Sequence, residues 1–250
     1  MSFLIGLLAG TFGGLLGGGG GVIMIPLMVY RYKLIQRQAH GTSLFALVFT
    51  GLSGAATYAF NNSVDYTAAL LLAATAVPMT RLGARYCHSL AEWKLKRYFG
   101  FFLIVIAVLL VAKPYYIHFS HSMTGWAKVA VLLFIGLFTG FFSGMMGIGG
   151  GAIMIPAMVL LIGMSQHIAQ GSSLLCMVPA GAVGAFTHRR LGNIADSILP
   201  GLISGILIGA FLGGNVAVFL PEGVLRIIYS AVVIWTGLRY AASKEAVCED

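Results

Sequence analysis

Two glycine runs inside long apolar stretches constrain the fold of this chain more than any other feature. The first is Gly17–Gly21, which is followed by Val22-Ile23-Met24-Ile25-Pro26. The second is Gly147-Ile148-Gly149-Gly150-Gly151, which is followed by Ala152-Ile153-Met154-Ile155-Pro156. Glycine loses more backbone entropy on ordering than other residues and weakens a helix interior. In a membrane, a broken helix is tolerated only where protein or a wet cavity satisfies the freed backbone groups. The sequence therefore predicts two membrane helices, each broken at its glycines.

The composition is that of a polytopic membrane protein. The chain is 59% hydrophobic and 9% charged, whereas soluble domains carry roughly 25% charged residues. Its net charge of +8 comes from basic residues between the apolar runs, which is typical of cytoplasmic loops, so we expect no nucleic-acid partner. Cys87, Cys176 and Cys248 are scattered without a CxxC motif. We therefore expect no disulfide framework, metal site or cofactor.

Eight apolar runs indicate an all-α fold with eight to ten helical membrane segments. They cover residues 3–30, 43–60, 66–86, 98–117, 131–162, 172–187, 194–218 and 223–241. The run 3–30 would form a helix of about 42 Å at 1.5 Å per residue, against a hydrocarbon core of about 30 Å. We expect this run and 131–162 to divide at their glycines into a re-entrant hairpin or two short crossings.

The second half of the chain repeats the first. A shift of 130 residues takes Pro26 to Pro156 and aligns about half of the positions between 5 and 57 with identical residues. We divide the chain into repeat 1 (1–117), a linker (118–130) and repeat 2 (131–250, with a short C-terminal tail). Internal repeats of this kind are common in transporters, where the substrate site lies at the repeat interface.

The charges of the joints predict that the two repeats are inverted. Arg31, Lys33 and Arg37 follow the first run, and a second basic group lies at and after the end of the run 66–86 (Arg81, Arg85, Lys94, Lys96 and Arg97). The joints 61–65 and 164–169 contain no Lys or Arg, whereas Arg189 and Arg190 follow the run 172–187. Since basic joints lie in the cytoplasm, equivalent joints of the repeats face opposite sides. We expect three full spans and one broken segment per repeat, with both termini cytoplasmic.

The glycine runs suggest an anion site. A helix that begins near Gly20 or Gly21 presents N–H groups without intrahelical partners, together with the positive end of its dipole. We expect two such ends to face each other near the bilayer midplane, with the substrate against Gly19, Gly20, Gly21, Gly149, Gly150 and Gly151. The alternative is that glycines only allow close helix packing, which fits Gly6, Gly10 and Gly14.

A second pair of segments supplies candidate donors. Ala39-His40-Gly41-Thr42-Ser43-Leu44 is equivalent to Ala169-Gln170-Gly171-Ser172-Ser173-Leu174. We expect these hydroxyls to stand where the next helix begins, and to donate, with the His or Gln side chain, to an oxyanion. This adds His40, Thr42, Ser43, Gln170, Ser172 and Ser173 to the candidate site. The alternative is ordinary N-capping. Arg81 and Arg85 fit a cytoplasmic anchor better than a substrate contact, because their equivalents Phe211 and Asn215 are not basic.

An anion permease fits these features best. The acidic residues Asp65, Glu92, Asp196 and Glu222 fall near joints, so a carboxylate relay in mid-membrane is not expected. An inside-negative potential favours anion export by roughly 2.3 kcal/mol per charge per 100 mV. Two alternatives stay open: an anion channel of the same architecture, and an intramembrane serine protease using Ser53 of Gly51-Leu52-Ser53-Gly54.

The paired motifs resemble a known family. The GxGGGxxxxP segments that end at Pro26 and Pro156, each followed by A-x-G-[TS]-S-L, are similar to those of the sulfite exporter TauE/SafE family. The resemblance covers essentially the whole chain. It implies a multi-pass permease of the bacterial inner membrane for sulfur-containing oxyanions or organosulfonates, such as sulfite or sulfoacetate-like compounds. The unbroken run of five glycines departs from the second copy, where Ile148 interrupts it.

Overall fold

The computed structural model describes residues 1–86, 92–116, 123 and 125–242. Their elements in chain order are α1 (Ser2–Leu16), α2 (Gly21–Tyr32), α3 (Gln36–Phe60), α4 (Tyr66–Tyr86), α5 (Glu92–Tyr116), α6 (Gly125–Met146), α7 (Gly151–Ala157), the π-helical turn η1 (Met158–Ile162), α8 (Gln166–Arg190), the 3-10 turn η2 (Asp196–Ile198), α9 (Leu199–Phe219) and α10 (Glu222–Ala241). The all-α prediction is confirmed for these residues. The described residues do not include Cys87, Cys248 or much of the predicted linker, nor the side chains of Glu92, Lys94 and Lys96.

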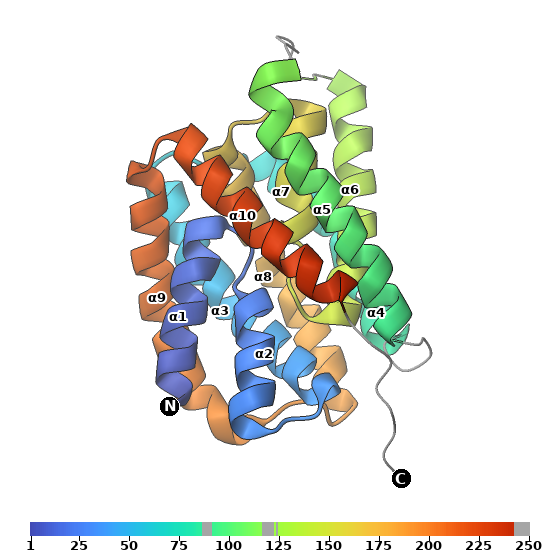
Figure 1. Cartoon of the computed structure of the whole chain (residues 1–250), viewed down its shortest axis with the longest axis vertical. Helices are drawn as coiled ribbons and strands as arrows, with labels where there is room; N and C mark the ends of the chain where they lie inside the picture. The colour runs from blue at the N-terminus through green and yellow to red at the C-terminus, as the bar shows by residue number, and fades with distance from the viewer. Residues whose placement is uncertain (87–91, 117–122, 124, 243–250) are drawn as a thin grey trace.

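Both long apolar runs are broken at the predicted glycines. Helix α1 ends before Gly17, whose φ is 67°, and α2 begins at Gly21. Gly20 then lies against the Ala9 carbonyl oxygen, so the chain turns back along α1. Figure 1 shows α1 rising from the N-terminus and α2 descending again. Helix α6 ends at Met146 and α7 begins at Gly151, which gives the second run the same break.

Glycines also allow two pairs of helices to pack backbone to backbone. Gly6, Gly10 and Gly14 of α1 face α9, where a Cβ on Gly10 would lie 2.8 Å from the Cα of Ile206. Their equivalents on α6 face α4, where a Cβ on Gly140 would lie 2.6 Å from the Cα of Ala76. The packing interpretation is therefore confirmed for this stripe, since small residues let membrane helices approach closely.

Helices α3 and α8 form the centre of the molecule and run antiparallel. Gly51 of α3 faces Leu174 of α8, and Gly181 of α8 faces Leu44 of α3. Helices α5 and α10 are also antiparallel, because Gly100 lies against Gly237 and Tyr240. Figure 1 shows α10 running obliquely across the near side of the molecule, past the upper ends of α1 and α2.

The apolar helices fit a multi-pass membrane protein. Six of the described helices are long and apolar enough to span a membrane: α3, α4, α6, α8, η2–α9 and α10. Shorter apolar helices cover residues 2–16, 21–32, 97–112 and 151–162. The broken runs account for three of these four shorter helices.

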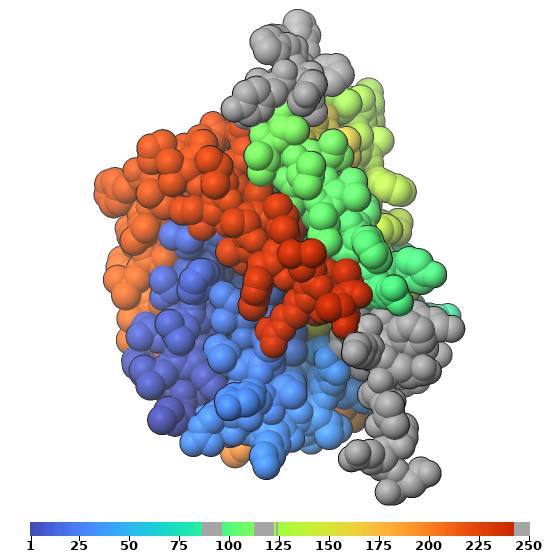
Figure 2. All heavy atoms as spheres, viewed as in Figure 1, coloured from blue at the N-terminus to red at the C-terminus, as the bar shows by residue number. Residues whose placement is uncertain are grey.

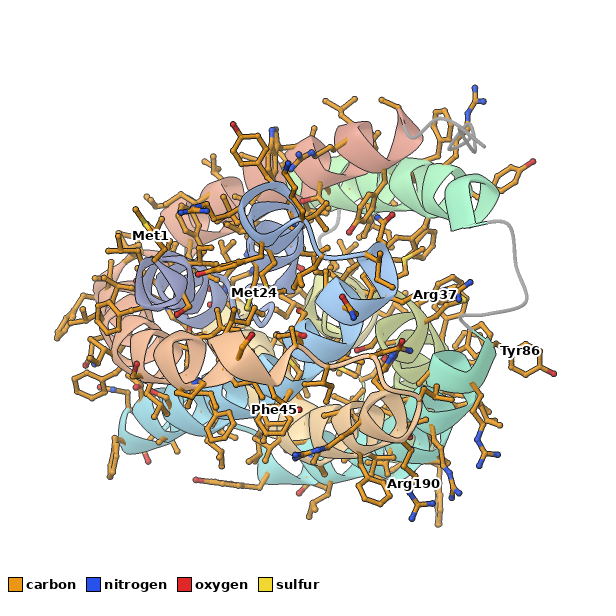
Figure 3. The ribbon with its side chains drawn as sticks, turned by 90° about the horizontal axis from the view of Figure 1, so that it is seen from below. Met1, Met24, Arg37, Phe45, Tyr86 and Arg190 are labelled. Atoms are coloured by element: carbon orange, nitrogen blue, oxygen red, sulfur yellow. The ribbon has the colours of Figure 1, made fainter. Side chains whose placement is uncertain are left out.

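The joints gather at two ends of the antiparallel α3–α8 pair. At one end the Thr42 hydroxyl accepts a hydrogen bond from the Ala195 N–H (3.0 Å), which brings the start of α3 to the joint after Arg189 and Arg190. Figure 3 shows Arg37 and Arg190 on this side of the molecule, seen from below. At the other end the Ser172 hydroxyl accepts from the Asp65 N–H (2.9 Å). The joints without Lys or Arg meet there.

Candidate functional site

The two glycine breaks pack directly against each other. A Cβ on Gly151 would lie 2.5 Å from the Cα of Gly18, and a Cβ on Gly21 would lie 2.8 Å from the carbonyl oxygens of Gly147 and Ile148. We call the contact between residues 17–21 and 147–151 the crossing; no side chain fits between the two segments there. Because Gly21 and Gly151 are the first residues of α2 and α7, two helix N-termini begin at one place in the protein.

One predicted hydroxyl from each half lies beside these helix starts. Ser43 donates to the Gly147 carbonyl oxygen (2.8 Å), and its Oγ is 2.9 Å from the Cβ position of Gly21. Ser173 contacts the Met154 sulfur (3.9 Å), with its Oγ 3.2 Å from the Cβ position of Gly151. Both serines are fully buried. The structure therefore brings Ser43 and Ser173 to the crossing.

Thr42 and Ser172 lie away from the crossing, because their hydroxyls hold the joints of the other half through the hydrogen bonds to Ala195 and Asp65. The prediction that these motifs stand at a helix start is wrong. Helices α3 and α8 begin at Gln36 and Gln166, more than a turn earlier. The N-capping alternative is wrong for the same reason, since the cap of α8 is Ser165, which accepts from the Ile168 N–H. The polar residues His40, Thr42 and Ser43 lower the hydropathy of this segment, but the structure buries them inside α3.

His40 and Gln170 occupy equivalent positions behind the crossing. Gly147 lies against His40, and Gly17 lies against Gln170. In each pair, a Cβ on the glycine would lie 2.7 Å from the Cα of the polar residue. The Oε1 of Gln170 accepts from the Tyr58 hydroxyl (2.8 Å). Its Nε2 is buried and has no hydrogen-bond partner among the described residues. A carboxamide donor is thus held beside the first glycine break.

Tyr58 is a contributor that the sequence analysis missed. Its hydroxyl lies 3.2 Å from the Gly14 carbonyl oxygen as well as 2.8 Å from Gln170. The equivalent residue, His188, has its Nε2 3.1 Å from the Gly144 carbonyl oxygen. Both side chains are fully buried. The repeat alignment already pairs these two polar aromatic residues, and that pairing could have identified them.

A pocket of about 350 Å³ opens beside the crossing, between α2, the start of α3 and α10. We call it the open pocket; it is lined by Val22, Ile25, Pro26, Val29, Tyr30, Gln36, His40, Trp235, Thr236, Arg239 and Tyr240. Its lining includes the cationic Arg239 and no carboxylate. Val22 and Thr236 also line a cavity of about 30 Å³ that reaches Gly18 and Gly20. Figure 2 shows the face on which α10 meets α2.

Ser53 and the two arginines of α4 have other surroundings. Ser53 donates to the Leu207 carbonyl oxygen (2.8 Å) and so links α3 to α9. Arg81 and Arg85 are exposed near the end of α4, as expected for residues that anchor a helix at the membrane surface. The crossing therefore contains backbone N–H groups and a carboxamide that can donate to an anion. It also contains the carbonyl oxygens of Gly147 and Ile148, the first of which accepts from the Ser43 hydroxyl.

Comparison with known proteins agrees with this architecture. The family model described as "Sulfite exporter TauE/SafE" matches residues 2–240. The "Probable membrane transporter protein YunE" of Bacillus subtilis is 29% identical over 95% of this chain and 96% of its own length. A "Probable membrane transporter protein" of Xylella fastidiosa is 26% identical, over 92% of each chain. The comparison with solved structures gave no match. The chain is a multi-pass membrane transporter, not an enzyme, and it belongs to the sulfite exporter TauE/SafE family.

Proposed function

We propose that the protein exports a small anion, a sulfur oxyanion or an organosulfonate, across the bacterial inner membrane. The observation that carries this proposal is the crossing, where α2 and α7 begin within contact of each other. Each helix N-terminus has the equivalent of about half a positive charge and N–H groups without intrahelical partners. Two such ends at one place favour a ligand with negatively charged oxygens.

We further propose that the two halves are inverted repeats, with repeat 1 at 1–117, a linker at 118–130 and repeat 2 at 131–250. Three features support this division. Helix α1 packs on α9 as α6 packs on α4, the contacts of α3 and α8 are equivalent, and α3 and α8 run antiparallel. An arrangement in which the basic end lies in the cytoplasm puts both termini inside.

The substrate contacts that we propose come from both halves. The groups around the crossing are the backbone of Gly19–Gly21 and Gly149–Gly151, the hydroxyls of Ser43 and Ser173, and the side chains of His40 and Gln170. Thr42 and Ser172 contribute through the joints that they hold. The cavities at the crossing are small, about 30 and 10 Å³. Their size favours a carrier that moves during transport, rather than a channel that is permanently open.

The direction follows from the charge of the substrate. An anion leaving a cell with an inside-negative potential moves downhill by roughly 2.3 kcal/mol per charge per 100 mV. Export therefore needs no coupling ion.

The test is flux through purified protein in liposomes with an imposed potential. Sulfite and a panel of organosulfonates are the substrates. We expect saturable efflux from the liposomes, and we expect this efflux to increase with an inside-negative potential. Flux that does not saturate would indicate the channel alternative. No flux of any sulfur oxyanion or sulfonate would overturn the proposed substrate class.

Variants of the polar residues test the site better than variants of the glycines, because a side chain at Gly20 would overlap the backbone of Ala9. We expect Gln170→Leu to weaken the apparent affinity roughly 10- to 100-fold, since a hydrogen bond to a charged group contributes about 1.5–3 kcal/mol. The matched control is Ser53→Ala, which removes a hydroxyl from the α3–α9 contact. Equal flux in Gln170→Leu, Ser43→Ala and Ser53→Ala would contradict the site.

A further inference from the structure

Equivalent regions of the two halves differ in exposure. Val29 lines the open pocket and is 36% exposed, whereas its equivalent Val159 is 0% exposed. Gln36 is exposed, whereas Gln166, the same residue type at the equivalent position, is completely buried. The region equivalent to the open pocket lies between α7–η1, α8 and α5. It is closed.

The backbone of the two regions differs in the same sense. Helix α5 packs directly on α7 and η1, while the open pocket separates the equivalent helices α10 and α2. Helix α2 continues as an α-helix to Tyr32, but the equivalent segment Met158–Ile162 is a π-helix. π-Helical turns are rare and often lie at functional sites. The segment that closes this region is therefore wound differently from its counterpart.

The closed region contains polar groups without partners. Neither the Nε2 nor the Oε1 of Gln166 has a hydrogen-bond partner among the described residues, and the Nε2 of Gln170 also has none. Both side chains are fully buried and, four residues apart on α8, lie on one face of that helix. Buried amides are normally hydrogen-bonded, and exceptions call for an explanation. Opening of this region to water would satisfy all three groups, and an anion would accept from the two Nε2 groups.

We propose that the region between α5, α7–η1 and α8 is a second anion-binding pocket, which opens toward the side opposite the open pocket when the open pocket closes. This inference rests on the transport function proposed above. The carboxamide N–H groups of Gln166 and Gln170 donate to the oxyanion there. The positions equivalent to the open-pocket lining define the rest of the wall: Val105, Ile106, Leu109, Leu110, Ala152, Ile155, Pro156, Val159 and Leu160.

The two pockets differ in charge, and this difference sets their affinities. The open pocket contains Arg239 and His40, whose equivalents in the second pocket are Leu109 and Gln170. A cation attracts an anion more strongly than a neutral carboxamide does, because the hydrogen bond is charge-assisted. The anion is therefore captured in the open pocket at the basic end and released from the second pocket, where the Glu222 carboxylate accepts from the Gln166 backbone N–H (2.6 Å). The equilibrium across the membrane is unchanged by this asymmetry, but the half-saturating anion concentration is lower on the side of the open pocket.

Cysteine accessibility tests the second pocket independently of transport. In a chain with Cys87, Cys176 and Cys248 replaced by alanine, Gln166→Cys is exposed to a membrane-impermeant maleimide from outside the cell. We expect labelling at roughly 0.1–10% of the rate at Met164→Cys in the adjacent joint, the usual population of a minor state. Leu174→Cys is the control, since Leu174 is equally buried and lies one turn beyond Gln170 on α8. It is expected to stay unlabelled.

Two further arms decide the outcome. Val29→Trp places a bulky side chain in the open pocket and prevents its closure, so labelling of Gln166→Cys is expected to be lost. Methanesulfonate, which does not react with maleimide, is expected to slow the labelling by occupying the pocket. If Gln166→Cys does not fold, Val159→Cys, which is fully buried at the wall of the same pocket, replaces it.

The results separate this proposal from the transport function. A protein that transports sulfonates while Gln166→Cys and Val159→Cys label no faster than Leu174→Cys would overturn the second pocket alone. Outside labelling that Val29→Trp leaves unchanged would overturn its coupling to the open pocket. Outside labelling without any sulfonate flux would support the pocket and contradict the proposed substrate.

Discussion

At the scale of single residues, the glycines that end α1 and α6 have a role that no other residue can take. Gly17 and Gly147 have φ angles of 67° and 66°, a region that residues with a Cβ enter at a cost. The Cβ position of Gly17 is 2.6 Å from the Cβ of Gln170, and that of Gly147 is 2.9 Å from the Cβ of His40. Each glycine thus seats the polar side chain that the other half contributes to the site.

Alanine at Gly17 should destabilise the protein, because it combines left-handed strain of about 1–2 kcal/mol with overlap on Gln170. Gly18→Ala is the matched control, since a Cβ there has nothing within 4 Å. The measurement is the thermal unfolding midpoint of each variant in detergent. We expect a clear decrease for Gly17→Ala and little change for Gly18→Ala. Equal midpoints would contradict the role assigned to the Gly17 conformation.

Much of the site at this scale was predictable from the repeat. The alignment paired Ser43 with Ser173 and His40 with Gln170, and the structure brings Ser43 and Ser173 to the crossing. The role of Thr42 was not predictable. Its hydroxyl serves the Ala195 N–H of a joint that is 153 residues away in sequence, and only tertiary packing brings that joint near.

At the scale of helices, an ion pair joins α4 and α6 at their starts. The Lys128 ammonium donates to Asp65 Oδ2 (2.8 Å), and Asp65 Oδ1 accepts from the Ala68 N–H (2.9 Å). Partial burial raises the pKa of Asp65. This effect is outweighed by the hydrogen bond from Lys128, by those from the backbone N–H groups of Ala68 and Thr67, and by the charge of Lys128, all of which lower the pKa. The pKa of this carboxyl therefore lies below its usual range.

A lowered pKa makes the contribution of Asp65 dependent on pH. The stabilisation is complete above the unfolded pKa of about 4 and is lost as the pH falls through the lower folded value. We expect Asp65→Asn to cost about 0.5–1 kcal/mol near neutral pH and to flatten the dependence of the unfolding midpoint on acid pH. Asp196→Asn is the control, because its pair with Arg189 is long (3.8 Å) and exposed. Identical acid profiles for Asp65→Asn and the unmodified protein would refute the assignment.

The helices also show where sequence reasoning ends. The breaks at Gly17 and Gly147 were predictable, because two glycine runs in apolar segments leave few other solutions in a membrane. The opposite burial of Gln36 and Gln166 was not. These residues are identical and equivalent, but about half of the aligned positions around them differ between the repeats. The burial of each glutamine is therefore set by its tertiary contacts, such as that of Gln166 with Glu222.

At the scale of the whole molecule, the inverted arrangement predicts that equivalent positions are reached from opposite sides of the membrane. Asn61 at the end of α3 and Leu191 at the end of α8 are equivalent and both exposed. Because α3 and α8 run antiparallel, these two positions lie at opposite ends. Because the Leu191 end carries Arg189 and Arg190, we expect it to lie in the cytoplasm.

We expect Asn61→Cys in intact cells to react with an impermeant maleimide, and Leu191→Cys to react only after permeabilisation. Met164→Cys and Leu34→Cys form a second equivalent pair, with Met164 reached from outside and Leu34 from inside. The readout is the mass shift of the labelled protein with and without permeabilisation. Labelling of Asn61→Cys and Leu191→Cys from the same side would make the repeats parallel. The N-termini of α2 and α7 would then point in the same direction, and a site built from two opposed helix ends would be impossible.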